Sequence, residues 1–163
     1  MRIVVADTGP LNYLVLIGAI GVLPKLFDQV LAPQAVFDEL TDRDTPPPTR
    51  AWVTQAPDWF TIHPDPAQTG HDETTAALDV GERAAIALAV ALKADLVLMD
   101  DRDGVIVARA KGLAATGTLG VLDLAARRGL IDLAEAVARL KATSFYYRQG
   151  LIDALLARHD GKT

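Results

Sequence analysis

Short apolar runs alternate with helical segments along this chain, and that alternation limits the folds open to it. Arg2–Ala6 (RIVVA) is an apolar run rich in branched side chains, and Asp95–Met99 (DLVLM) is a second. Continuous apolar runs of this length are typical of strands buried on both faces, as in a parallel sheet. Because helical segments separate the strands, we expect a three-layer α/β/α fold around a central parallel sheet.

The remaining elements are predicted from shorter signals. Weaker strands are predicted at Gln29–Ala32, Trp59–His63 and Ala114–Thr116. Helices are predicted at about Leu11–Ala19, Gly21–Phe27, Pro33–Thr41, Arg50–Gln55, Asp79–Ala94, Asp103–Lys111, Thr118–Arg128, Asp132–Ala142 and Gln149–His159. Asp42–Pro48, with its three prolines, and Pro64–Thr74 are predicted loops. Gly112 and Gly129 follow two of the helices, in the position where a left-handed residue commonly ends a helix.

Length and composition predict a single domain over residues 1–163. Half of the residues are hydrophobic, which is enough apolar material for a full core. The chain has no cysteine, so disulfide frameworks and zinc–thiolate sites are excluded. The N-terminal apolar stretch is interrupted by Asp7, and Leu11–Leu23 is too short to span a bilayer. We therefore expect a cytoplasmic protein with no membrane segment.

Charge is unevenly distributed along the chain. The net charge is −5, which argues against a protein that coats nucleic acid. Residues 1–81 carry 4 Lys/Arg against 11 Asp/Glu, whereas residues 82–163 carry 12 against 10. An acidic first half and a mildly basic second half are compatible with an acidic cleft that has a basic rim. Binding to a phosphate backbone needs only such a local positive surface.

Several strong catalytic motifs are absent from the sequence. There is no Walker A loop, no GxGxxG after a strand, no HExxH and no GxSxG elbow. The histidines His63, His71 and His159 are not spaced as metal ligands. The candidates for chemistry are therefore the carboxylates.

Carboxylates follow the two strongest predicted strands directly. Asp7 follows the first strand, and Asp100 and Asp101 follow the second. Ligands of open α/β sheets bind outside the carboxyl ends of the strands, so these side chains converge if the strands are neighbours. Carboxylates held close together repel each other, and oxygen-only ligands suit Mg²⁺ or Mn²⁺. Such an ion can activate water and neutralise charge on a phosphodiester.

Each candidate also has a purely structural interpretation. Asp7 and Asp103 are residues that favour helix caps, and Glu39 is compatible with an ordinary surface glutamate. Glu82 has capping-box spacing from Asp79. Residues 101–104 resemble the start of a calcium loop, but the later ligands of such a loop are missing.

Four stretches of the chain together resemble the PIN-domain superfamily, and within it a prokaryotic branch related to VapC-type toxins. They are VVADTGPLNYL, APQAVFDEL, DVGERAAIALAVALKADLVLMDDRDG and GLAATGTLGVLDLAARRGLI. They occur in the expected order and run from residue 2 to about residue 131. No single motif is specific, whereas the combination at these spacings is.

The resemblance implies a parallel sheet of about five strands and an acidic site that hydrolyses RNA with Mg²⁺ or Mn²⁺. It implies the catalytic residues Asp7, Glu39, Glu82 and Asp101. The expected metal ligands are Asp7, Glu82, Asp100, Asp101 and Asp103, with Asp101 favoured by its place at the strand end. Thr8, Arg83 and Arg102 are the expected substrate-binding residues. The chain departs from the pattern of VapC-type toxins at two positions. It has Met99 where these toxins usually have Thr or Ser, and Glu82 where they usually have Asp.

The expected function is therefore that of a metal-dependent endoribonuclease. The resemblance further suggests a toxin restrained by a small antitoxin protein, and a homodimer. A PIN-like nucleic-acid-binding or regulatory module without useful turnover is the alternative. A receiver domain is disfavoured, because it would need an acidic pair after its first strand, where only Asp7 stands.

Overall fold

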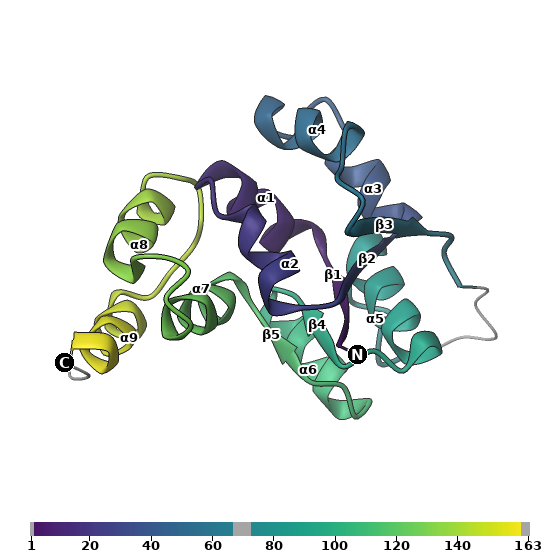
Figure 1. The fold of residues 1–163 in the computed structure, drawn as a ribbon. Helices are drawn as coiled ribbons and strands as arrows, with labels where there is room; N and C mark the ends of the chain where they lie inside the picture. The colour runs from purple at the N-terminus through teal and green to yellow at the C-terminus, as the bar shows by residue number, and fades with distance from the viewer. Residues whose placement is uncertain (1, 67–72, 161–163) are drawn as a thin grey trace.

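A five-stranded parallel sheet forms the centre of the protein within residues 2–66 and 73–160, which are the residues described by this computed structural model. The strands are β1 (Ile3–Ala6), β2 (Gln29–Pro33), β3 (Phe60–His63), β4 (Leu96–Leu98) and β5 (Ala115–Thr116). Their order is β3-β2-β1-β4-β5 (Figure 1). The predicted three-layer fold is confirmed. Residues 67–72, which include His71 and part of the predicted loop Pro64–Thr74, lie outside the described residues.

Alternate residues of β1 face two different cores. Val4 and Ala6 belong to the larger core, whereas Val5 belongs to the smaller one, as the two-residue period of a strand requires. The smaller core is covered by α5 (Val80–Leu92) and α6 (Arg102–Ala110). The larger core is covered by α1 (Thr8–Leu16), α2 (Leu23–Leu26), α3 (Gln34–Leu40), α4 (Pro47–Thr54), α7 (Thr118–Arg127), α8 (Leu133–Lys141) and α9 (Gln149–Asp160). In Figure 1, α8 and α9 lie beyond α7, on the side away from β3.

Several helix starts differ from the prediction, and α1 begins at Thr8, three residues before the predicted Leu11, with Pro10 in its first turn. Asp101, not Asp103, is the N-cap of α6, and its carboxylate accepts a hydrogen bond from the Gly104 amide at 2.9 Å. The chain is still extended at Asp101, so the cap lies two residues before Asp103 and the helix begins at Arg102, one residue before the predicted start. Likewise, α4 begins at Pro47 rather than Arg50, because proline is well suited to a first helical turn, where its missing N–H is not needed.

The helix ends follow the predicted signals more closely. Gly112 and Gly129 have φ values of 85° and 71°, the left-handed conformation that ends α6 and α7. Lys93 adopts the same conformation after α5, with φ 52°, without being glycine. No single helix of the described chain is long and apolar enough to cross a membrane. Only α1 and the segment Ile20–Leu26 taken together, bent by 113°, match a span in length and composition.

The register of the sheet brings three strand ends to one edge. Ala6 pairs with Leu98, and Leu98 pairs with Thr116, so β1, β4 and β5 end at the same level. The residues that follow these strands therefore emerge side by side, and the first turns of α1, α6 and α7 lie above them.

Candidate active site

Asp7 lies at the centre of this edge. It occupies the N-cap position of α1 and is only 7% exposed, and its amide donates a hydrogen bond to the Leu98 carbonyl at 2.8 Å. The pKa of this carboxyl is raised from 3.8 to about 7, mainly by burial. The charges of Asp79, Glu39 and Asp100 contribute to the rise, while a hydrogen bond from the Thr8 backbone opposes it. Every charged side chain that shifts this pKa is thus another carboxylate.

Glu39 reaches the same place from α3. The Thr8 hydroxyl donates a hydrogen bond to Glu39 Oε2 at 2.9 Å, which ties α3 to the first turn of α1. Burial raises the pKa of this carboxyl, the hydrogen bond from Thr8 lowers it, and Asp79 and Asp42 raise it. Although Glu39 is an exposed residue, its carboxylate is held by the hydrogen bond from Thr8. Thr8 therefore positions an acid of this site.

The first turn of α5 supplies further acids. Asp79 caps this helix by accepting a hydrogen bond from the Glu82 amide at 2.8 Å. A Cβ atom on Gly81 would lie 2.8 Å from Glu39 Oε2, 3.5 Å from Asp7 Oδ1 and 3.6 Å from Asp79 Oδ1. Carboxylates from three separate stretches of chain therefore surround one point beside Gly81.

Glu82 has the other strongly raised pKa at this edge. The pKa of this carboxyl is raised from 4.5 to about 8, mainly by burial and then by its hydrogen bond and charge interaction with Asp79. Smaller contributions come from the charges of Asp101 and Asp7. Glu82 thus belongs electrostatically to the same cluster, between the α1 side and the α6 side.

Asp100 and Asp101 occupy different environments although they are neighbours in sequence. The Asp100 carboxylate accepts two hydrogen bonds of 2.7 Å, from the amide and the hydroxyl of Thr118. Its Oδ2 lies 3.2 Å from the position of a Cβ atom on Gly9, so it faces the first turn of α1. Asp101 is exposed and caps α6.

The remaining predicted residues have no bond to this cluster within the described chain. Arg102 and Asp103 are exposed in the first turn of α6, and no hydrogen bond or ion pair within residues 2–66 and 73–160 joins either of them to the acids around Asp7. Arg83 is half-buried, and its buried Nε has no hydrogen-bond partner among the described residues. The structure therefore brings together Asp7, Thr8, Glu39, Glu82 and Asp100, with Asp101 beside Glu82.

The donors in this cluster suit a divalent cation chemically. All of them are carboxylate oxygens, which Mg²⁺ and Mn²⁺ prefer, and burial together with their mutual repulsion raises the pKa of Asp7 and Glu82. In their positions here, no three acidic or histidine side chains of the described chain are gathered tightly enough to hold one ion. The residues thus fit such an ion by chemistry and by charge.

Two residues of this edge were not predicted as part of the site. Asp79 was interpreted only as a helix cap, and its sequence signal, the capping-box spacing, describes that role correctly. Thr118 is fully buried and holds Asp100 through two hydrogen bonds. The sequence feature that could have indicated Thr118 is its position, two residues after a predicted strand and at the same edge of the sheet as the acids.

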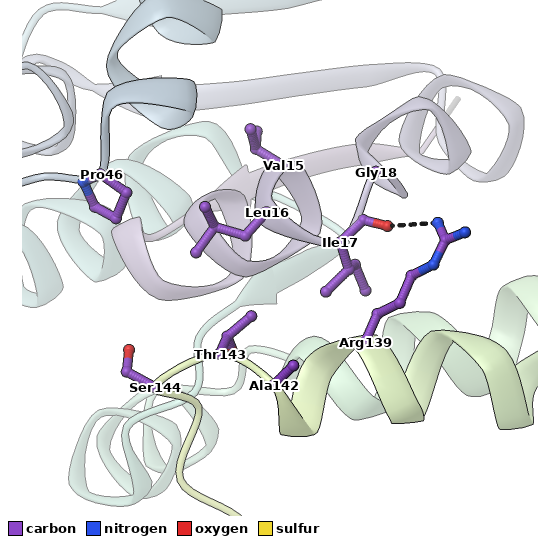
Figure 2. Close-up of a pocket in the computed structure, with 9 residues that line it drawn as sticks. All are labelled: Val15, Leu16, Ile17, Gly18, Pro46, Arg139, Ala142, Thr143 and Ser144. Atoms are coloured by element: carbon purple, nitrogen blue, oxygen red, sulfur yellow. Dashed lines mark hydrogen bonds between the residues drawn. The ribbon is translucent and has the colours of Figure 1, made fainter.

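A separate hollow of about 800 Å³ lies at the far end of α1. Its lining residues are Val15, Leu16, Ile17, Gly18, Pro46, Arg139, Ala142, Thr143 and Ser144 (Figure 2). Arg139 closes one side by donating a hydrogen bond to the Ile17 carbonyl at 3.3 Å. No carboxylate lines this hollow, so it does not belong to the acidic site.

Comparison with known proteins gives one family. A family model described as a PIN domain matches residues 3–161, nearly the whole chain. Proteins of that family are generally nucleases and typically use divalent metals. No curated protein matches the chain.

Proposed function

Because this chain belongs to the PIN-domain family, we propose that it is a Mg²⁺- or Mn²⁺-dependent endoribonuclease that hydrolyses RNA phosphodiester bonds at the acidic edge of the sheet. One observation carries the proposal: carboxylates of Asp7, Glu39 and Asp79, from three stretches of chain, surround one point beside Gly81. Repulsive carboxylates held together in this way cost stability, so a structural role alone is a poor explanation for them.

The proposed ion-holding residues are Asp7, Glu39, Glu82 and Asp100, with Asp101 and Asp103 at the outer side. A divalent ion held there would supply an activated water and offset negative charge on the phosphodiester. Thr8 orients Glu39, and Thr118 orients Asp100, each through hydrogen bonds that fix a carboxylate oxygen. The hydrogen bond from the Asp7 amide to β4 holds the backbone of the central acid in place. These contacts preorganise the acids before substrate binds.

The proposed RNA contacts come from Arg83 and Arg102. Arg83 has a buried Nε with no partner among the described residues, and Arg102 is exposed at the start of α6. A guanidinium group presents several donors in a fixed plane and matches phosphate oxygens well. Arg83 lies in the first turn of α5 and Arg102 in the first turn of α6, and these two turns also carry proposed acids.

Cleavage of single-stranded RNA in the presence of Mn²⁺ tests the proposal. We expect the wild-type protein to cut RNA and Asp7→Asn to abolish cutting. Asp153→Asn is the matched control, since Asp153 is an exposed acid on α9, far along the chain from the site. Equal cleavage by Asp7→Asn and wild type would rule out the proposed site.

A catalytically weak RNA-binding module is the second candidate function. It is favoured by the fact that the acids of the described chain approach one point but are not gathered tightly enough in these positions to hold an ion. RNA binding by wild type in a gel-shift assay, without cleavage in Mn²⁺, would identify this module.

A toxin role is a further proposal based on the resemblance. Its restraining antitoxin, the homodimer and a cytoplasmic location remain predictions. If the protein is a toxin, its expression arrests growth, and Asp7→Asn relieves the arrest.

A further inference from the structure

Gly81 has an ordinary helical backbone conformation, so backbone strain does not explain why glycine occupies this position. The explanation has to be a lack of room for a side chain. It is buried at the second position of α5, and it is not among the glycines with positive φ. Glycine is one of the least favourable residues within a helix. We infer that Gly81 is a positioning residue of the acid cluster, because its missing side chain leaves the space in which the carboxylates of Glu39, Asp7 and Asp79 converge.

The close approach to Glu39 is the strongest of these contacts. At 2.8 Å from Glu39 Oε2, a Cβ atom at position 81 would be closer than real Cβ contacts allow. Glu39 Oε2 is also the atom that accepts the Thr8 hydrogen bond, so this carboxylate is not a free side-chain end. A methyl group at position 81 would have to displace Glu39 from Thr8, from Asp7 or from both.

A second glycine repeats the arrangement at the start of α1. Gly9 is the second residue of that helix, also without a positive φ, and a Cβ atom there would lie 3.2 Å from Asp100 Oδ2. Asp100 is held in turn by Thr118. Gly150, the second residue of α9, shows the contrast: nothing lies within 4 Å of its Cβ position.

The consequence is that Gly81 sets how closely acids from α1, α3 and α5 approach one another. Mg²⁺ requires near-ideal geometry with short oxygen distances, so a shift of one carboxylate is enough to weaken its binding. The inference about metal binding rests on the proposed function. The steric relation between Gly81 and Glu39 does not.

Calorimetric titration with Mn²⁺ tests the link to metal binding. We expect Gly81→Ala to bind Mn²⁺ at least tenfold more weakly than wild type. Gly150→Ala makes the same change at the same helical position and should bind within twofold of wild type. A Gly81→Ala protein that binds Mn²⁺ as tightly as wild type overturns the inference. If wild type itself does not bind Mn²⁺, the proposed function fails, and unfolding measurements decide the role of Gly81.

Those measurements are a double-mutant cycle in urea with EDTA. In the wild-type background, Gly81→Ala should favour unfolding at least tenfold. In a Glu39→Ala background the same substitution should have no such cost, because the obstructing carboxylate is gone. Rescue of an unfolded Gly81→Ala protein by Glu39→Ala supports the inference equally. An equal cost in both backgrounds, or a failure of both proteins to fold, shows that position 81 serves packing alone.

Discussion

Asp7 is a carboxylic acid placed where the fold disfavours its ionised form. It is 7% exposed, and Asp79, Glu39 and Asp100 add negative charge around it. A group of this kind lowers the stability of the protein at neutral pH and is retained where function requires it. The same holds to a lesser degree for Glu82, which is more exposed.

The raised pKa of Asp7 predicts how stability depends on pH. Because the pKa rises from 3.8 to about 7 on folding, the stabilisation is complete below about pH 4 and is lost as pH rises through 7. The metal-free protein should therefore lose on the order of 2–4 kcal/mol of unfolding free energy between pH 4 and pH 8. Glu82, with a pKa of about 8, extends the decline to higher pH.

Urea unfolding in EDTA across this pH range measures the effect. Asp7→Asn should make the profile flatter and should be more stable than wild type at pH 8. Asp123 does not interfere in this range, because its lowered pKa acts only at more acidic pH. A wild-type profile that is flat between pH 4 and pH 8 would contradict the assignment of Asp7 as a buried, repelled acid.

At the scale of helices and strands, the end of α5 is strained. Lys93 is the non-glycine residue with positive φ in the described chain, at 52°, and it occupies the C-cap of α5. Non-glycine residues in this conformation cost about 1 kcal/mol, so Lys93→Gly should stabilise the protein by roughly 0.5–1 kcal/mol. Lys93→Ala gives the control, since it removes the same side chain but leaves a residue with a Cβ atom in the left-handed conformation, so that it relieves no strain. A shift in the urea midpoint for Lys93→Gly alone is the expected result.

Substitutions at the start of α6 can distinguish a role in helix capping from a role in catalysis. Asp101→Ala should cost about 1 kcal/mol through loss of the cap, whereas Asp103→Ala should cost at most a few tenths. Asp101→Asn keeps a good cap and removes the charge, so it should fold like wild type in a thermal melt.

Asp100→Asn should reduce RNA cleavage more than Asp101→Asn does, because Asp100 faces the first turn of α1. Equal loss of cleavage from both substitutions would favour Asp101 as a direct ligand.

Much of the element pattern was predictable because it depends on local chemistry. RIVVA and DLVLM became β1 and β4, and glycines ended α6 and α7 as expected. The boundaries that failed were those at which two cap residues or several prolines compete, as at Asp101/Asp103 and Pro46–Pro48. The environment of Asp79 could not be predicted, because its approach to Glu39 depends on how α3 packs against α5.

For the whole molecule, the decisive information is the order of the strands. Asp7 and Asp100 meet because β1 pairs with β4, and Glu39 joins them because β2 lies on the other side of β1. The sequence predicts parallel strands but contains no direct signal for which strands are neighbours. Convergence at the sheet edge was therefore a conditional prediction, and the topology supplies the missing condition.

This topology makes metal binding a property of the folded protein as a whole. The acids are spread along the sequence from Asp7 to Asp100, so they are far apart in the unfolded chain. An ion that binds all of them in the folded protein therefore stabilises the native state by mass action. Mn²⁺ at a hundred times its dissociation constant should add about 2.7 kcal/mol to the unfolding free energy. The gain should be larger at pH 8 than at pH 6, because protons on Asp7 and Glu82 compete with the ion. Thermal melts with and without Mn²⁺ measure this, with Asp153→Asn expected to respond like wild type and Asp7→Asn expected to respond little. An equal Mn²⁺ shift in Asp7→Asn would place the bound ion elsewhere on the molecule.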